Sequence, residues 1–166
     1  MTPTNSNCTI TLLRAKGPRL AKTLHPGGIF TPYGDARTFD MTEAPVASLE
    51  GLHGILAKLL PRPDLCVVRG AIADPARAHG VRRLLHPDPE TGDLATLREV
   101  PRRWLALDLD GVPAPAGLHT ADLAACLGVV RPLLPAGFQG AGLVVQTTAG
   151  HAIKPGLRLR VWAWLS

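Results

Sequence analysis

Two segments in the second half of the chain alternate between apolar and polar residues, the pattern of half-buried β-strands. In residues 104–110 the leucines share one face, and Asp108 and Asp110 project together from the other. In residues 157–165 one face is aliphatic, and the opposite face carries Arg158, Arg160, Trp162 and Trp164. Antiparallel pairing of the two segments would set arginine against aspartate and tryptophan against tryptophan. We therefore expect these two strands to be neighbours.

The remaining pattern predicts shorter elements. Short apolar runs predict strands over residues 8–13, 64–70 and 142–148. Helical spacing predicts one helix that follows a cap and early proline in residues 42–45, and another that begins near Thr120 and ends before Pro132. A short helix is expected around residues 76–85. This order predicts an α+β fold with a mixed or antiparallel sheet flanked by helices.

Length and charge narrow the class of protein. The chain has 166 residues, of which 46% are hydrophobic, enough to bury the core of a single domain over residues 1–166. Lys and Arg outnumber Asp and Glu by 18 to 13, which suits a polyanionic partner. No acidic residue follows Asp122, so the last 44 residues carry only Arg131, Lys154, Arg158 and Arg160 as charged side chains. This end of the chain should attract phosphate.

Cysteine usage and hydropathy favour a cytoplasmic protein that does not enter a membrane. Cys8, Cys66 and Cys126 are odd in number and far apart, so they indicate neither a disulfide framework nor a zinc site. The first residues lack the pattern of a secretory signal, and no apolar run approaches eighteen residues.

The two aspartates on one strand face are the strongest chemical signal. Neighbouring carboxylates oppose joint ionisation unless a cation is present, and hard cations such as Mg²⁺ prefer carboxylate oxygens. The polar turn 147–154, with His151 and Lys154, precedes the arginine-bearing strand and adds cationic groups for phosphate. A metal-dependent reaction on phosphates is one reading. The other reading is a solvated sheet face with structural ion pairs.

Several of these motifs also carry a family resemblance. Leu107-Asp-Leu-Asp110, and residues 146–156 followed by the strand 157–165, resemble the archaeo-eukaryotic primase (primase-polymerase) superfamily, in particular its phage and mobile-element branch. Residues 66–70 and 102–104 are similar as well. The likeness runs from about Leu65 to the end of the sequence.

The resemblance implies a DNA primase/polymerase-type nucleotidyltransferase that uses Mg²⁺ or Mn²⁺ and transfers nucleotides from NTP or dNTP on a DNA template. It implies the N-terminal catalytic part of a longer replication protein, with a fused or associated helicase as a further partner. Metal ligation falls to Asp108 and Asp110, which with His151 form the catalytic set. The residues expected to bind the nucleotide are Thr148, His151, Lys154, Arg158 and Arg160. Weaker candidates for DNA binding are Arg69, Arg102 and Arg103, the last two expected on a solvated face.

The sequence departs from the family pattern at two points. The family's motif histidine lies in the strand, where this chain has Arg160, so either His151 or Arg160 fills that role. The third acidic residue of the family has no counterpart after Asp122. The chain is then either a fragment or a catalytically incomplete module that binds nucleotide or nucleic acid.

Two rival readings remain. Residues 107–112 resemble the first motif of haloacid-dehalogenase-like phosphatases, but the later lysine and acidic pair of that family are missing. A non-enzymatic module would bind nucleic acid through the arginines and through bases stacked on Trp162 and Trp164, if both are exposed. Burial of these tryptophans would exclude stacking.

Overall fold

The computed structural model describes residues 8–165, which form two compact units. Unit 1 comprises the chain as far as Lys22 together with Pro32–Arg103, and unit 2 comprises Thr23–Thr31 and the chain from Trp104 onward. The sequence predicts a single domain, whereas the structure gives each unit its own three-stranded sheet. No linker composition marks the second boundary, because strand β8 (Trp104–Val112) begins directly after Arg103.

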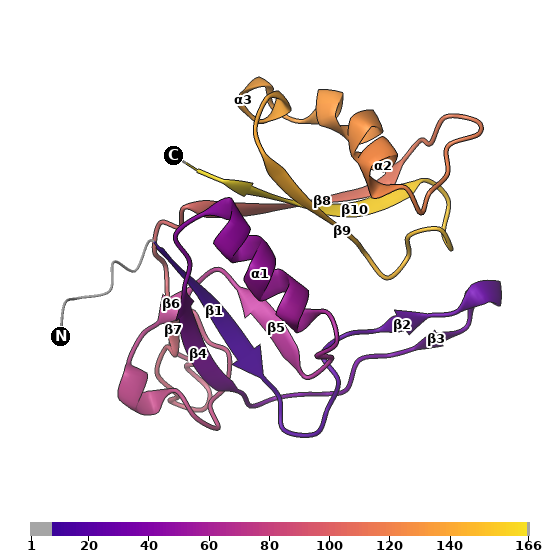
Figure 1. Cartoon of the computed structure of the whole chain (residues 1–166). Coiled ribbons are helices and arrows are strands. Elements are labelled where there is room, and N and C mark those ends of the chain that lie inside the picture. Colours follow the sequence, from indigo (N-terminus) through magenta and orange to yellow (C-terminus); the bar gives the residue numbers. More distant parts are fainter. Residues whose placement is uncertain (1–7, 166) are drawn as a thin grey trace. The chain divides into compact units, whose positions relative to one another are not determined.

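The sheet of unit 1 is antiparallel, with the order β4-β1-β5. Its strands are β1 (Thr9–Arg14), β4 (Asp40–Pro45) and β5 (Leu65–Val68). Helix α1 (Leu49–Leu59) covers one face of this sheet (Figure 1). On the other face, Leu13 and Met41 pack with residues of the two-stranded sheet β6 (Ala71–Ile72) and β7 (Leu97–Arg98). Because β1 is central, its residues from Thr9 to Leu13 are buried or nearly so, whereas Arg14 at its end is exposed.

Helix α1 begins later than the sequence predicts. The side chain of Ser48 caps it by accepting a hydrogen bond from the N–H of Gly51. The segment expected to cap it, residues 42–45, belongs instead to β4, whose Met41 pairs with Leu13 of β1. A polar-apolar alternation of six residues is too short to compete with the stronger helical pattern that follows it, so the strand was not predicted.

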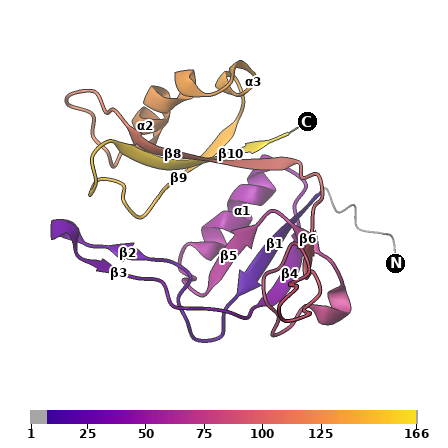
Figure 2. The same cartoon turned by 180° about the vertical axis from the view of Figure 1, so that it is seen from behind.

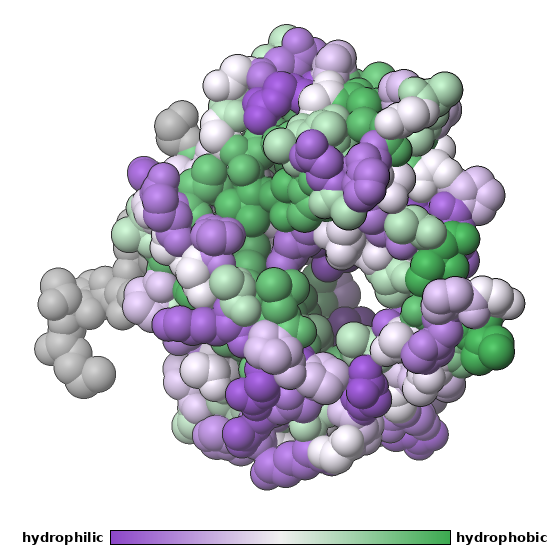
Figure 3. Space-filling view, turned by 45° about the vertical axis from the view of Figure 1, so that its right-hand side comes forward, coloured by the Kyte–Doolittle hydropathy of each residue, from purple (hydrophilic) through white to green (hydrophobic). Residues whose placement is uncertain are grey.

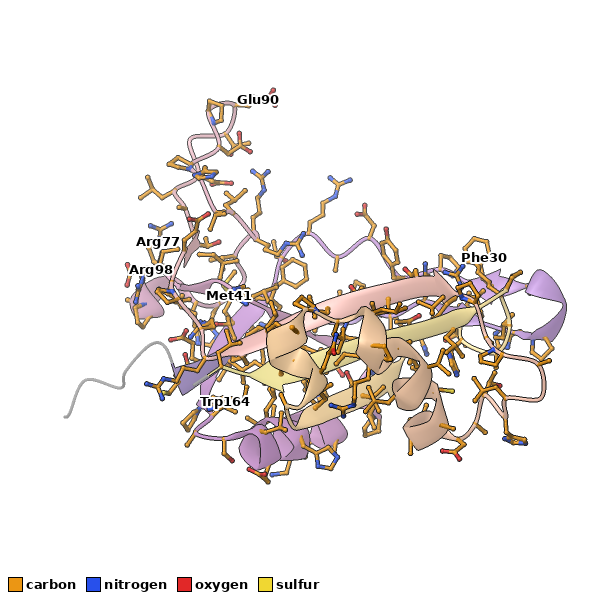
Figure 4. The ribbon with its side chains drawn as sticks, turned by 90° about the horizontal axis from the view of Figure 1, so that it is seen from above. Phe30, Met41, Arg77, Glu90, Arg98 and Trp164 are labelled. Atoms are coloured by element: carbon orange, nitrogen blue, oxygen red, sulfur yellow. The ribbon has the colours of Figure 1, made fainter. Side chains whose placement is uncertain are left out.

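The later part of unit 1 has little regular structure. The helix expected around residues 76–85 is reduced to one turn of 3₁₀-helix, η3 (Pro75–Arg77), capped by the Asp74 side chain. The loop that follows is held by Arg82, which forms ion pairs with Asp88 and Asp93 at 2.7 and 2.9 Å. Figure 4 shows this loop, which bears the label Glu90 at its outer end.

The sheet of unit 2 has the order β8-β10-β9, and all of its pairs are antiparallel. Strands β9 (Leu143–Thr147) and β10 (Leu157–Trp164) form an antiparallel hairpin. One face is covered by α2 (Leu123–Val130), η4 (Arg131–Leu133) and α3 (Ala136–Gln139), as Figures 1 and 2 show. The core between them contains Cys126, Val130, Leu157 and Leu159. Asp122, rather than Thr120, caps α2.

A small hairpin completes the described chain. Strands β2 (Thr23–Leu24) and β3 (Phe30–Thr31) pair only with each other among the described residues, around the 3₁₀ turn η2 (Pro26–Gly28). The structure is thus a mixture of small antiparallel sheets and few helices. It agrees with the α+β class that the sequence predicts. Over residues 8–165 no helix combines the length and the apolar character needed to cross a membrane.

Candidate functional site

Strands β8 and β10 are neighbours in the register that their alternation predicts. Arg158 lies opposite Asp110, Arg160 opposite Asp108, and Trp164 opposite Trp104. Cross-strand partners share a face, so the two aspartates and two arginines lie side by side on the sheet face opposite the leucines. We call Asp108, Asp110, Arg158 and Arg160 the Asp–Arg ladder.

Each aspartate of the ladder already has an arginine partner. Arg160 forms a two-point contact with Asp108, Nε to Oδ1 at 2.6 Å and Nη2 to Oδ2 at 2.9 Å. Arg158 Nη1 donates to Asp110 Oδ1 at 3.1 Å. The hydrogen bonding that Arg160 donates to Asp108 is the main cause that raises the pKa of the Arg160 guanidinium, which therefore stays charged. The Asp108 and Asp110 side chains remain 53% and 61% exposed, so solvent and ligands can reach both carboxylates.

His151 holds the turn before β10 in place. Its Nδ1 accepts a hydrogen bond from the backbone N–H of Arg158 at 3.2 Å, and its Nε2 lies 2.9 Å from the carbonyl oxygen of Thr120. Because an N–H can only donate and a carbonyl can only accept, this geometry requires the neutral tautomer with the proton on Nε2. Both ring nitrogens are occupied, which makes His151 a positioning residue in this arrangement.

The turn itself packs closely on the stem of Arg158. A Cβ placed on Gly150 would lie 2.9 Å from Arg158 Cδ and 3.3 Å from Lys154 Cδ, so only glycine fits without displacing a side chain. The backbone N–H of Thr148 donates to the Arg158 carbonyl at 3.0 Å. Arg158 Nε is buried and has no hydrogen-bond partner among the described residues. Lys154 is exposed on the same turn.

The tryptophans do not form an exposed stacking platform. Trp162 is 3% exposed, and its Nε1 donates to Gln146 Oε1 at 2.7 Å. Its ring centroid lies 5.7 Å from that of Trp104, which is equally buried. Trp164 is half-buried (labelled in Figure 4). Base stacking on both Trp162 and Trp164 is therefore excluded in this conformation.

Arg102 is not on a solvated face, and that expectation is wrong. Its side chain has no exposed surface, and Nη2 contacts Glu43 Oε1 at 2.9 Å. The guanidinium also donates to the hydroxyls of Thr9 and Thr11 and to two backbone carbonyls, of Arg69 and Gly70. It is enclosed inside unit 1, where a nucleic acid phosphate cannot reach it. Arg69 and Arg103, the other two DNA-binding candidates, are exposed.

The metal-ligand set is limited to the two aspartates. Within residues 8–165 there is no cluster of three or more His, Cys, Asp and Glu side chains that could hold an ion. The third acidic residue of unit 2, Asp122, accepts the N–H of Ala125 and caps α2. Mg²⁺ is commonly held by one or two carboxylates together with water and substrate phosphates, so Asp108 and Asp110 fit that mode of binding chemically.

Unit 1 contains a cleft that the sequence did not reveal. Its volume is about 1010 Å³, and its walls include Tyr33, Arg37, Phe39, Arg82 and Arg83. These residues come from segments separated by more than forty positions, and no linear motif connects them. Arg37 is paired with Asp35 and Arg82 with Asp88, so acidic side chains balance most of the positive charge in this cleft.

Comparisons of the chain with protein-family models, with curated proteins and with solved structures found no match. Any statement about function therefore depends on the chemistry of the residues described above.

Proposed function

We propose that unit 2 is the metal- and triphosphate-binding part of a primase-polymerase-type nucleotidyltransferase that acts on a DNA template. The observation that carries the proposal is the register of β8 and β10, which sets two solvent-accessible carboxylates against two guanidinium groups on one sheet face. Asp108 and Asp110 would hold Mg²⁺ or Mn²⁺. When bound, the metal would neutralise the triphosphate and lower the pKa of the attacking hydroxyl.

The ion pairs of the ladder suit an exchange of partners. The two carboxylates and two guanidinium groups sum to zero formal charge, and each carboxylate is paired with an arginine until ligands arrive. A metal-bound triphosphate offers a cation to the aspartates and anionic oxygens to the arginines. Half-exposed ion pairs contribute only about 0–1 kcal/mol each, so their exchange costs little.

The turn before β10 supplies an additional feature that favours an anion. Arg158 Nε is a buried donor without an acceptor among the described residues, which is unfavourable unless a ligand or water accepts its hydrogen bond. Gly150 lets the turn pack closely on the stem of Arg158, and Lys154 adds a second cation on the same turn. We assign the phosphate contacts to Lys154, Arg158 and Arg160, with Thr148 and His151 positioning the turn.

Of the two candidates for the motif-histidine role, Arg160 is the better one. It lies on the strand, contacts Asp108 directly and is half-exposed. His151 uses both ring nitrogens to connect Thr120 with Arg158, so it has no free nitrogen for a phosphate oxygen.

A catalytically incomplete module that binds nucleotide or nucleic acid is the second candidate. The specific observation in its favour is that unit 2 has only three acidic residues, and the third one caps a helix. Such a module would still bind a metal–nucleotide complex, because the ladder and the turn remain.

The test combines binding with catalysis. Titration calorimetry would measure binding of Mn²⁺ with a nucleoside triphosphate, and a primed-template assay would measure extension. We expect the double substitution Asp108→Asn and Asp110→Asn to abolish both signals, whereas Glu50→Gln, an exposed carboxylate on α1, changes neither. Wild-type binding without extension would select the incomplete module, and absence of metal–nucleotide binding by the wild type would overturn both candidates.

A further inference from the structure

The connection between β1 and β4 exposes apolar side chains that no part of the described chain covers. Ile29, Phe30 and Tyr33 are 71%, 60% and 65% exposed. Ile29 and Phe30 directly follow the turn of the β2–β3 hairpin, and Tyr33 lies three residues after Phe30. Figure 3 shows hydrophobic residues at the surface among hydrophilic ones on the right-hand side, where the hairpin lies, and Figure 4 labels Phe30 there. Clustered exposed apolar residues mark interaction sites.

The hairpin is poorly stabilised by its own contacts. Only two residue pairs join β2 to β3, Thr23 with Thr31 and Leu24 with Phe30. An isolated two-stranded hairpin is marginally stable in water, and this one pairs with no further strand among the described residues. Gly27 and Gly28 adopt positive φ angles of 83° and 82°, which fix the tight turn beside Ile29. A bound partner would stabilise such an element.

The charge of this connection indicates a polyanion. Residues 16–37 carry four cations, Lys16, Arg19, Lys22 and Arg37, and one acid, Asp35. Arg37 is paired with Asp35 at 3.2 Å, and Lys16 is paired with Asp40 at 3.3 Å. Lys22, directly before β2, is exposed. Proteins bind single-stranded nucleic acid with two components, aromatic rings that stack on bases and cationic side chains that contact the backbone. This connection has both.

We infer that the β2–β3 hairpin and its flanks bind single-stranded nucleic acid, with Phe30 stacking on a base and Lys22 contacting a phosphate. This inference deepens the proposed function by naming the element that would contact a template, and it rests on that proposal for the class of partner. An anionic lipid surface and a second copy of the chain are the competing occupants. The lipid is less favoured because the apolar residues are few and lie on a two-stranded ribbon rather than on a long amphipathic helix.

The experiment measures binding of a fluorescent single-stranded oligonucleotide by anisotropy, without divalent metal or nucleotide, so that it does not depend on Asp108 or Asp110. Phe30→Ala should weaken binding by about fivefold to 150-fold, the range for stacking of one base on an aromatic ring. Phe30→Tyr should retain wild-type affinity. Leu94→Ala, which truncates another exposed apolar side chain, is the matched control and should have no effect.

A second variant tests the electrostatic part. Lys22→Ala should lower the slope of log K against log salt by about 0.7, the value for one phosphate contact of a single strand. Lys58→Ala, an exposed lysine on α1, should leave the slope unchanged. Equal affinity of wild type and Phe30→Ala would overturn the inference. So would Phe30-dependent binding to anionic vesicles, or Phe30-dependent self-association in sedimentation, in place of oligonucleotide binding. The Asp108 and Asp110 double variant separates the two proposals. It should lose metal–nucleotide binding but keep oligonucleotide binding.

Discussion

Each unit pairs arginine with a carboxylate distant in sequence, but the two sets of ion pairs differ in their access to solvent. In unit 1 the Arg102 side chain is fully enclosed and contacts Glu43, two threonine hydroxyls and two backbone carbonyls. In unit 2 the Asp–Arg ladder lies on a face where its carboxylates are more than half exposed. The same chemistry thus gives an enclosed network in one unit and solvent-accessible pairs in the other.

The largest effect is expected from removal of the enclosed arginine. Arg102→Ala deprives Glu43 and the hydroxyls of Thr9 and Thr11 of their donor, and the free energy of unfolding should fall by about 3–5 kcal/mol. Urea unfolding at neutral pH measures it. Arg103→Ala, the exposed neighbour, should stay within about 0.5 kcal/mol of wild type. A loss below about 1 kcal/mol for Arg102→Ala would erase the contrast between the units.

An intermediate effect should follow from a glycine beside the ladder. Gly156 has a φ of 75°, and a Cβ at this position would lie 2.7 Å from the backbone carbon of Gly111. Gly156→Ala should therefore cost about 1–3 kcal/mol. Gly117→Ala has a similar φ of 79° but no atom within 4 Å of the added Cβ, so it measures the backbone strain alone. If both variants lose the same amount, the close approach of β8 and β10 contributes nothing.

The ladder itself should contribute little to stability. A double-mutant cycle of Asp108→Asn and Arg160→Ala should give a coupling free energy of about 0.2–1 kcal/mol, because both side chains are about half exposed. The coupling should shrink in 1 M salt, where the screening length is about 3 Å. Coupling well above about 1 kcal/mol would instead assign the ladder a structural role like that of Arg102.

The last effect is confined to acid conditions and concerns Asp40, a buried acceptor whose donors Arg14 and Lys16 are exposed. The hydrogen bond that Arg14 donates to Asp40 is the main cause that lowers the pKa of Asp40 from 3.8 to about 2. The N–H of Gly80 and the ammonium of Lys16 lower the pKa of Asp40 in the same direction. The folded pKa lies below the unfolded one, so the stabilisation is fully present above pH 3.8 and is lost as the pH falls towards 2. Asp40→Asn should remove this part of the acid dependence. Thermal unfolding between pH 5 and 2 measures it, and identical slopes for both proteins would contradict the assignment.

The strand pattern of unit 2 was predictable because one face of its sheet is apolar and the other polar. That alternation fixed the register of β8 against β10, including the pairing of Arg160 with Asp108. The short strand β4 and the division into two units were not predictable. Both depend on contacts distant in sequence, such as Met41 with Leu13, rather than on a local pattern.

The chemical roles were harder to predict than the strands. Arg102 and Arg103 are neighbours of the same residue type, yet Arg102 is enclosed and Arg103 is exposed. The difference comes from the contacts of Arg102 with Glu43, Thr11 and the carbonyl of Gly70, all of which are distant in sequence. His151 looked like a phosphate ligand from its glycine and lysine neighbours. Only the positions of Thr120 and the Arg158 N–H show that both its nitrogens are engaged.

The order of strands in unit 2 has a consequence for biosynthesis. Strand β10 lies between β8 and β9 but is synthesised after both. Until the ribosome releases it, β8 and β9 lack the partner that each one pairs with in the finished sheet, and their backbone amides and carbonyls stay open to other chains. A nascent chain that stalls at the turn before β10 would therefore be the form most in need of a chaperone.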